Sequence, residues 1–165
     1  MAESTIVKTK RDGTIVFADL GASNSYTVAY EAGDLTIDIP GPTVTNSLDR
    51  GSIGATPSLR YGDDQPMTGS FTAQLRDISD ATDETLFELI AKSGAIAGWT
   101  STLGANAEVP AVTLTFTILG TAHGDSGGDH IIVCNHCVVT GGISEGDPST
   151  ISISFTSYDL YPTCT

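Results

Sequence analysis

The side chains with the strongest metal-binding chemistry in this chain lie together in one apolar segment: Cys134, His136 and Cys137. Thiolate and imidazole groups are the ligands that zinc prefers, and His123 and His130 lie nearby in the sequence. In a strand, however, Cys134 and His136 point to one face and Cys137 to the other, and the C-x-H-C spacing lacks the C-x-x-C turn that wraps a tetrahedral ion. Small buried thiols in a core strand explain the segment better, so we expect no metal site and no cofactor.

A second candidate for chemistry is the string Gly-Asp-Ser-Gly-Gly at residues 124–128, which matches the sequence around the nucleophile of chymotrypsin-like proteases. That family needs a histidine base and an aspartate in the chain order His, Asp, Ser. The first histidine in this chain is His123, only three residues before Ser126. Glycine, aspartate and serine between two strands are typical of a turn, and we interpret the string as one.

Paired carboxylates are the remaining candidates for acid–base catalysis. Asp63 and Asp64 lie in a predicted loop, and Asp83 and Glu84 lie where a helix is predicted to begin, so hydration and helix capping account for both pairs. The sequence contains no phosphate-binding loop, dinucleotide fingerprint or basic patch. We therefore expect a protein that is not an enzyme.

The composition favours one acidic β-rich domain. At 165 residues the chain is long enough for a core, and with 39% hydrophobic and 16% charged residues it is not of the disordered class. Frequent Gly, Ser and Thr favour strands and turns. Seven Lys and Arg against twenty Asp and Glu give a net charge of -13, which repels nucleic acid. Solubility or a salty habitat would account for the same acidity.

The sequence shows neither a secretory signal nor an apolar run long enough to cross a membrane. The odd number of cysteines agrees with free thiols in a reducing compartment, so we expect assembly in the cytoplasm.

Hydrophobic periodicity predicts a mainly β fold, a β-sandwich or partial barrel, with one flanking helix at about residues 81–92. Asp80 is the predicted N-cap of this helix and Gly94 its C-cap. Residues 1–13 are predicted to form an arm. Residues 40–65 form a long segment rich in Pro and Gly between strands, which we interpret as an extended hairpin or arm that orders on another subunit; a plain surface loop is the alternative. Strands are predicted at 14–19, 25–30, 34–39, 70–76, 111–119, 130–140 and 150–158, with 130–140 buried on both sides.

The polar faces of these strands carry Ser, Thr and Gln in place of Lys and Glu. A monomer that shows such a face to water usually scatters charges over it, which also protects its sheet edges. The pattern therefore favours a sheet whose edges pair with other copies and whose polar face lines a space.

The order of these elements resembles the tail tube (major tail) proteins of long-tailed bacteriophages, which are related to the tubes of contractile tails and type VI secretion. The segments that carry the resemblance are PMTGSFT at 66–72, RDISD at 76–80 and TLFELI at 85–90. It implies one tail-tube-like domain over residues 1–165, a β-sandwich with a flanking helix. It also implies hexameric rings stacked into a tube that conducts DNA, a long loop that reaches a neighbouring ring, and no catalytic residues.

These expectations assign residues to two surfaces. The lumen of the tube is expected to be lined by Thr36, Asp38, Ser70, Thr72 and Gln74, and the inter-ring loop is expected to use Ile53, Leu59, Arg60 and Tyr61. Further partners would be the tape measure, terminator and baseplate proteins of a virion tail, with DNA passing without specific binding and no membrane contact. The alternative is a monomeric β-sandwich that serves as a binding or decoration module of a virion or cell surface.

Overall fold

The computed structural model describes residues 13–28, 34–47, 58–78, 84–120 and 128–165. The predicted arm (apart from Gly13), Ile53, Asp80, His123 and Ser126 lie outside these ranges. The described chain is mainly β, with one short α-helix. Its strands are β1 (Gly13–Ala18), β2 (Ser25–Val28), β3 (Thr36–Asp38), β4 (Val44–Ser47), β5 (Ser58–Tyr61), β6 (Met67–Gln74), β7 (Val112–Ile118), β8 (His130–Ser144), β9 (Thr150–Ser157) and β10 (Thr163–Cys164).

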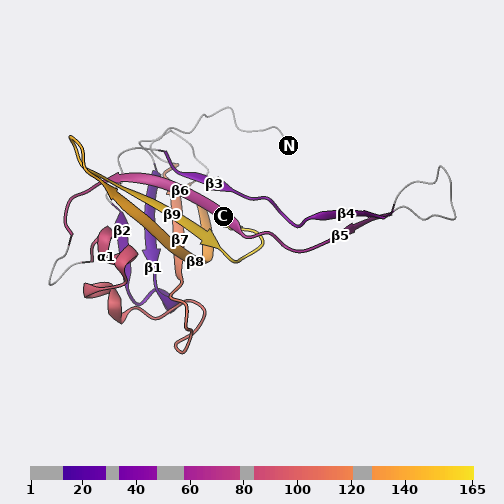
Figure 1. Cartoon of the computed structure of the whole chain (residues 1–165), viewed down its shortest axis with the longest axis horizontal. Helices are drawn as coiled ribbons and strands as arrows, with labels where there is room; N and C mark the ends of the chain where they lie inside the picture. Colours follow the sequence, from indigo (N-terminus) through magenta and orange to yellow (C-terminus); the bar gives the residue numbers. More distant parts are fainter. Residues whose placement is uncertain (1–12, 29–33, 48–57, 79–83, 121–127) are drawn as a thin grey trace.

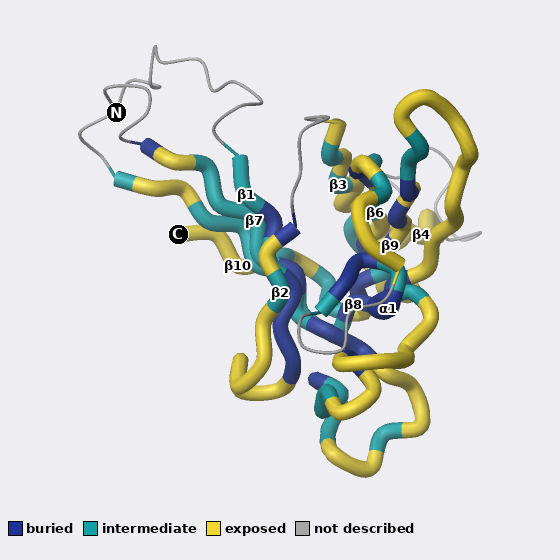
Figure 2. The backbone as a smooth tube through the Cα atoms, turned by 90° about the vertical axis from the view of Figure 1, so that its left-hand side faces the viewer, coloured by how far each residue is buried: buried dark blue, intermediate teal, exposed yellow. Residues whose placement is uncertain are grey.

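Eight of the strands form one antiparallel sheet in the order β2-β1-β7-β8-β9-β6-β3, with β10 also on β8. The long strand β8 pairs with β7 from His130 to Cys137 and with β9 from Cys137 to Ser144. Because β8 changes partner half-way, the sheet bends into two layers (Figures 1 and 2). The sheet does not close into a barrel, since β2 and β3 remain its two ends.

The core lies between the two layers. Phe17 on β1 and Phe71 on β6 stack across it with ring centroids 6.2 Å apart. The predicted alternation of β9 is confirmed, because Ile151, Ile153 and Phe155 are buried, whereas Ser152 and Ser154 are exposed. An inward row on β9 and the Phe17–Phe71 contact thus join the layers by apolar packing.

A β-bulge marks the point at which β8 changes partner. Asn135 and His136 together lie opposite the single residue Thr113, and His136 has a positive φ of 51°. The extra residue turns Cys134 and Cys137 to the same, core side, where both are fully buried. The prediction that Cys134 and His136 share a face was therefore wrong, because it assumed unbroken alternation. The prediction that 130–140 is buried on both sides was also wrong, since Thr140 is exposed.

Hydrogen bonds hold this bulge. The hydroxyl of Ser157 donates to the Asn135 carbonyl at 2.6 Å. His136 Nδ1 lies 3.2 Å from Thr102 Oγ1, and His136 Nε2 lies 3.8 Å from Asp159 Oδ1. The histidine thus ties β8 to a loop and to the C-terminal segment.

The helix is shorter than predicted: α1 spans Leu86–Ala91. Its N-cap is Thr85, whose hydroxyl accepts from the Glu88 backbone N–H at 3.2 Å, while the Glu88 carboxylate accepts from the Thr85 N–H at 3.3 Å. This capping box explains why the helix begins at Leu86 and not at 81. Lys92, at φ 52°, ends the helix, and Gly94 begins the 3-10 helix η3 (Gly94–Gly98) instead of acting as the C-cap. No helix among the described residues is long and apolar enough to cross a membrane.

The cysteines give a direct test of the core. Burial raises the pKa of the Cys134 thiol to about 11 and that of Cys137 to about 12, whereas Cys164 on β10 is exposed. Because the thiolate is the reactive form, we expect a maleimide or disulfide reagent at pH 8 to modify one thiol per folded chain and all three after unfolding. Mass spectrometry of the labelled protein measures this, and fast labelling at Cys134 in native protein would contradict the described core.

Candidate functional site

The layer formed by β3, β6, β9 and the second half of β8 has a continuous polar surface on its outward side. Strand register places Thr36, Ser70, Ser154 and Thr140 in one row across the four strands. Rows on either side of it have the same character, because alternate residues of each strand share this face. We call this surface the hydroxyl face; its members are Thr36, Asp38, Thr68, Ser70, Thr72, Gln74, Val138, Thr140, Gly142, Ser144, Thr150, Ser152, Ser154 and Thr156.

Several of these side chains are bonded within the sheet. The hydroxyls of Thr36 and Ser70 lie 3.1 Å apart, Thr140 donates to the Ser154 carbonyl at 3.4 Å, and Ser152 donates to the Gly142 carbonyl at 3.2 Å. The side chains are short, and Asp38 is the one ionisable member of the face. The result is a flat, hydrated surface that carries almost no charge.

All five residues predicted to line a lumen lie on the hydroxyl face: Thr36, Asp38, Ser70, Thr72 and Gln74. The structure adds residues from β8 and β9 that the sequence analysis did not assign to this surface. The alternation of Ser and Thr in β9 could have indicated that Ser152 and Ser154 lie on a polar face. That β9 lies beside β6, however, depends on long-range pairing, which the sequence pattern does not reveal.

The hairpin formed by β4 and β5 is the second candidate surface. It projects from the body along the long axis of the molecule (Figure 1). At its base the Thr43 N–H donates to the Asp63 carbonyl at 3.0 Å, and the Gly62 N–H donates to the Thr43 carbonyl at 2.8 Å. Within the described part of the 40–65 segment, β4 and β5 pair as an extended hairpin and not as a plain loop, whereas its ordering on another subunit stays a prediction.

The hairpin is amphipathic although both of its sides face solvent. Val44 pairs with Tyr61 on the same side as Leu59, and these side chains are 60%, 81% and 67% exposed. We call Val44, Leu59 and Tyr61 the apolar ribbon face; Asn46 lies on the same side, and Thr45 and Arg60 lie on the opposite side. An isolated two-stranded hairpin is at best marginally stable in water, so this one is suited to packing against a partner. Of the predicted loop residues, Leu59, Arg60 and Tyr61 are thus placed on β5.

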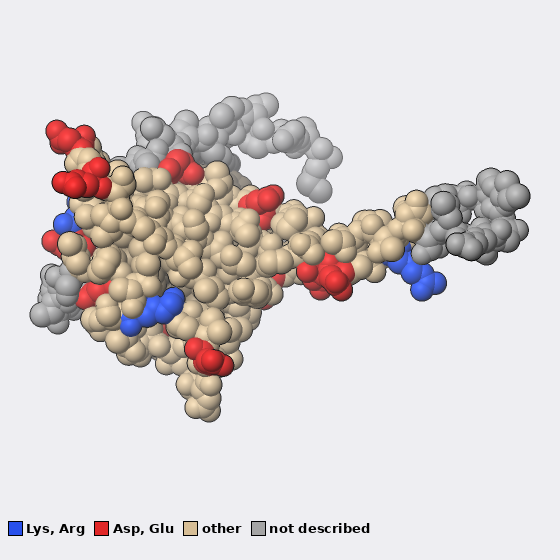
Figure 3. Space-filling model, viewed as in Figure 1, with Lys and Arg blue, Asp and Glu red and all other residues tan. Residues whose placement is uncertain are grey.

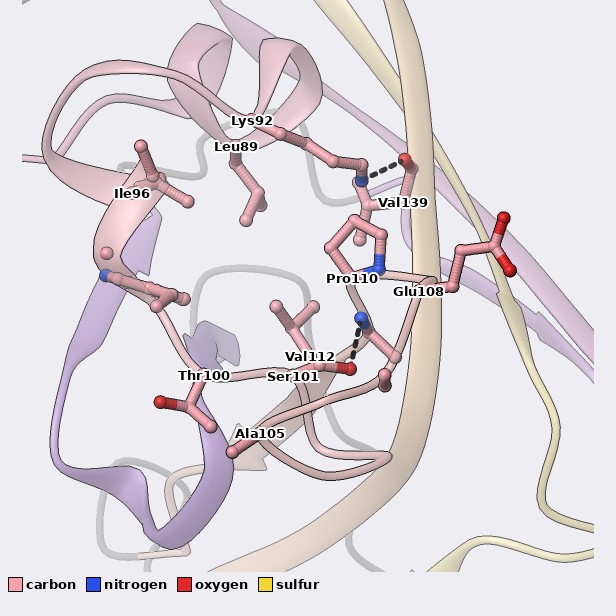
Figure 4. Close-up of a pocket in the computed structure, with 15 residues that line it drawn as sticks. Leu89, Lys92, Ile96, Thr100, Ser101, Ala105, Glu108, Pro110, Val112 and Val139 are labelled. Atoms are coloured by element: carbon pink, nitrogen blue, oxygen red, sulfur yellow. Dashed lines mark hydrogen bonds between the residues drawn. The ribbon is translucent and has the colours of Figure 1, made fainter.

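A pocket of about 470 Å³ lies between α1, η3 and the segment from Trp99 to Val112 (Figure 4). Its lining is mixed: Leu89, Ile96, Pro110 and Val112 are apolar, whereas Lys92, Thr100, Ser101 and Glu108 are polar. The Lys92 ammonium donates to the Val139 carbonyl at 3.5 Å, and burial lowers the pKa of this lysine. This pocket had no counterpart in the sequence analysis, because its lining comes from three separate segments.

Charge is unevenly distributed over the described surface. Acidic side chains are scattered over the body and the base of the hairpin, and basic ones are few (Figure 3). Three Lys and Arg residues lie within the described ranges. Arg60 is on the hairpin, Arg76 follows β6, and Lys92 lines the pocket. No group of three or more His, Cys, Asp or Glu in those ranges is arranged to hold a metal ion.

No protein-family model matches the chain, and no curated protein matches its sequence. Its fold has a solved counterpart. The chain is similar to one in the cryo-EM structure of the sheath–tube complex of an extracellular contractile injection system, PVC, in the extended state. The TM-score is 0.54, the sequence identity is 9%, and the match covers 92% of this chain and 87% of that chain. At this identity the similarity shows a shared fold.

Proposed function

We propose that the protein is a structural, non-enzymatic subunit that polymerises into a tube, the tail tube of a bacteriophage or a related particle. The observation that carries this proposal is the hydroxyl face, a polar surface without Lys or Arg on a sheet that stays open among the described strands. Similarity in fold to a chain of an injection-system sheath–tube complex supports it. The full proposal is that hexameric rings stack into a conduit for viral DNA in the virion tail, after assembly in the host cytoplasm.

Among the described residues, the layer that carries the hydroxyl face has two strand edges without a strand partner, although the Lys92 ammonium donates to the Val139 carbonyl of β8. β3 ends it on one side, and beyond Cys137 the described strands pair with β8 on one side only, through β9. Pairing β3 of one copy with the second half of β8 in the next would satisfy both edges. Repeated around a ring, this contact closes the layers into a barrel with the hydroxyl faces inward.

A lumen of this chemistry suits passage of a polyanion. Each Lys or Arg that contacts a phosphate adds salt-dependent affinity, and the hydroxyl face has none. Acidic charge on the body adds long-range repulsion. DNA would therefore pass without being held. The tape measure, terminator and baseplate proteins are the proposed further partners.

Negative-stain electron microscopy of concentrated, purified protein tests the assembly. We expect rings or tubes with a central hole; a uniform population of small globules would favour a monomeric binding or decoration module instead.

A labelling experiment tests which face lines the hole. Ser154→Cys in a Cys164→Ser background should react with a bulky polyethylene-glycol maleimide in dispersed subunits and be protected in long tubes. Asn106→Cys, at an exposed position away from the hydroxyl face, is the control that should react in both. Equal labelling of Ser154→Cys in tubes and subunits would overturn the lumen assignment.

A further inference from the structure

One edge of the layer that carries the hydroxyl face is covered by a side chain and not by a strand. Beyond Cys137, the described strands pair with β8 on one side only, through β9. On the other side, the Lys92 ammonium at the end of α1 donates to the Val139 carbonyl at 3.5 Å (Figure 4). Soluble proteins keep strand edges from pairing by placing lysine on them or by covering them with a helix or loop. Lys92 is placed to guard this edge in that way.

The bond from Lys92 lies at the backbone groups that an added strand would need. Successive residues of an antiparallel strand direct their N–H and C=O to opposite sides, so Ile143 presents its backbone groups on the same side as Val139. Gly142 faces the other way, because its carbonyl accepts from the Ser152 hydroxyl of β9 at 3.2 Å. A strand that paired along the open side of β8 would therefore need the carbonyl that Lys92 occupies.

The contact between Lys92 and this edge is easily released. Its N···O distance of 3.5 Å is at the long end for a hydrogen bond. Burial lowers the pKa of Lys92, so its ammonium gives up hydration to reach the carbonyl. The adjoining pocket of about 470 Å³, with Thr100, Ser101 and Glu108 in its lining, gives the displaced side chain room. A strand that forms several backbone hydrogen bonds can therefore displace Lys92.

We propose that Lys92 is a latch on the second half of β8: it covers the pairing edge in the free subunit and moves away when a strand of another copy pairs there. This inference rests on the proposed self-assembly through that edge and adds a control on when assembly begins. Because opening the latch costs free energy before the strand can pair, the latch raises the concentration at which subunits join.

Lys92→Met tests the latch, because methionine keeps an unbranched side chain and removes the ammonium. Loss of this one hydrogen bond should lower the protein concentration needed for assembly by about three- to tenfold, measured by sedimentation and electron microscopy. Long-range repulsion alone predicts the opposite sign, since the variant adds one net negative charge to a chain that carries -13. Lys92→Arg keeps a cationic donor and should assemble within about twofold of the unchanged protein.

A second variant ties the gain to this edge. Proline at position 143 removes a backbone donor from the open side of β8 and leaves the pairing with β9 in place. Lys92→Met with Ile143→Pro should therefore lose the gain, with thermal unfolding as the check that the variant is folded. A folded double variant that keeps the gain would overturn the assignment of the latch to this edge.

The latch and the tube proposal fail in different ways. If Lys92→Met needs the same or a higher concentration than the unchanged protein, the latch is wrong and the tube proposal stands. If neither protein assembles up to its solubility limit, both proposals are wrong. Assembly of Lys92→Met alone would support both, because the unchanged protein would then be held back by its latch.

Discussion

Excising the hairpin will leave a folded body that no longer polymerises. The Gly62 N–H donates to the Thr43 carbonyl at 2.8 Å, so the two residues already have the spacing that flanks a two-residue β-turn. Replacing residues 44–61 by Asn-Gly, a favoured turn sequence, should therefore close the chain without strain. The hairpin strands β4 and β5 contribute no residue to the buried core cluster, and we expect its free energy of unfolding to change little.

Thermal unfolding measures the stability of the excised variant, and electron microscopy shows whether it polymerises. The excised variant should melt within a few degrees of the unchanged protein, because β4 and β5 contribute no residue to the core cluster. It should show no tubes at concentrations where the unchanged protein forms them. Normal tubes from the variant would show that residues 44–61 are not an assembly element.

If the protein forms the proposed DNA conduit, lysines on the hydroxyl face should make that conduit hold DNA. Ser152 and Ser154 are exposed neighbours on β9, in the middle of that face. Ser152→Lys with Ser154→Lys would repeat two cations in every copy around the lumen. If about six to ten of these lysines contact phosphates, the affinity should fall by roughly 10³–10⁵ between 50 and 200 mM salt. Tubes of the unchanged protein should retain no DNA.

Retention of labelled DNA by sedimented tubes, measured across a salt series, quantifies this effect. The control carries the same two charges at exposed residues off the hydroxyl face, as Ser23→Lys with Asn106→Lys. It should bind DNA weakly, because the rest of its surface stays acidic. Equal retention by both variants would mean that the hydroxyl face does not line the channel.

Local alternation predicted much of this fold because it depends only on neighbouring residues. The inward Ile151, Ile153 and Phe155 row of β9 and the outward Ser and Thr residues were readable from a period of two. The five expected lumen residues share one face for the same reason, since β3 and β6 alternate in register. Their role in lining a lumen stays a prediction that the labelling experiment tests.

Features set by long-range pairing could not be predicted in this way. Nothing local indicates that β8 pairs with two partners, or that Asn135 and His136 form a bulge that turns both core cysteines inward. The pocket draws its lining from α1, η3 and a later loop. The start of α1, by contrast, could have been predicted locally. The Thr85-Leu86-Phe87-Glu88 signature of a capping box is in the sequence, but Asp80 was chosen as the N-cap instead.

The bulge at Asn135 and His136 also bears on whether residues can be inserted into or deleted from β8. Val139 lies on the core side of the second half of β8, and Thr140 lies on the hydroxyl face. Deleting either bulge residue would shift every later position of the strand by one, and a one-residue shift exchanges the two sides of a strand. We therefore expect a one-residue insertion or deletion at the bulge to destabilise the protein more than a substitution there would.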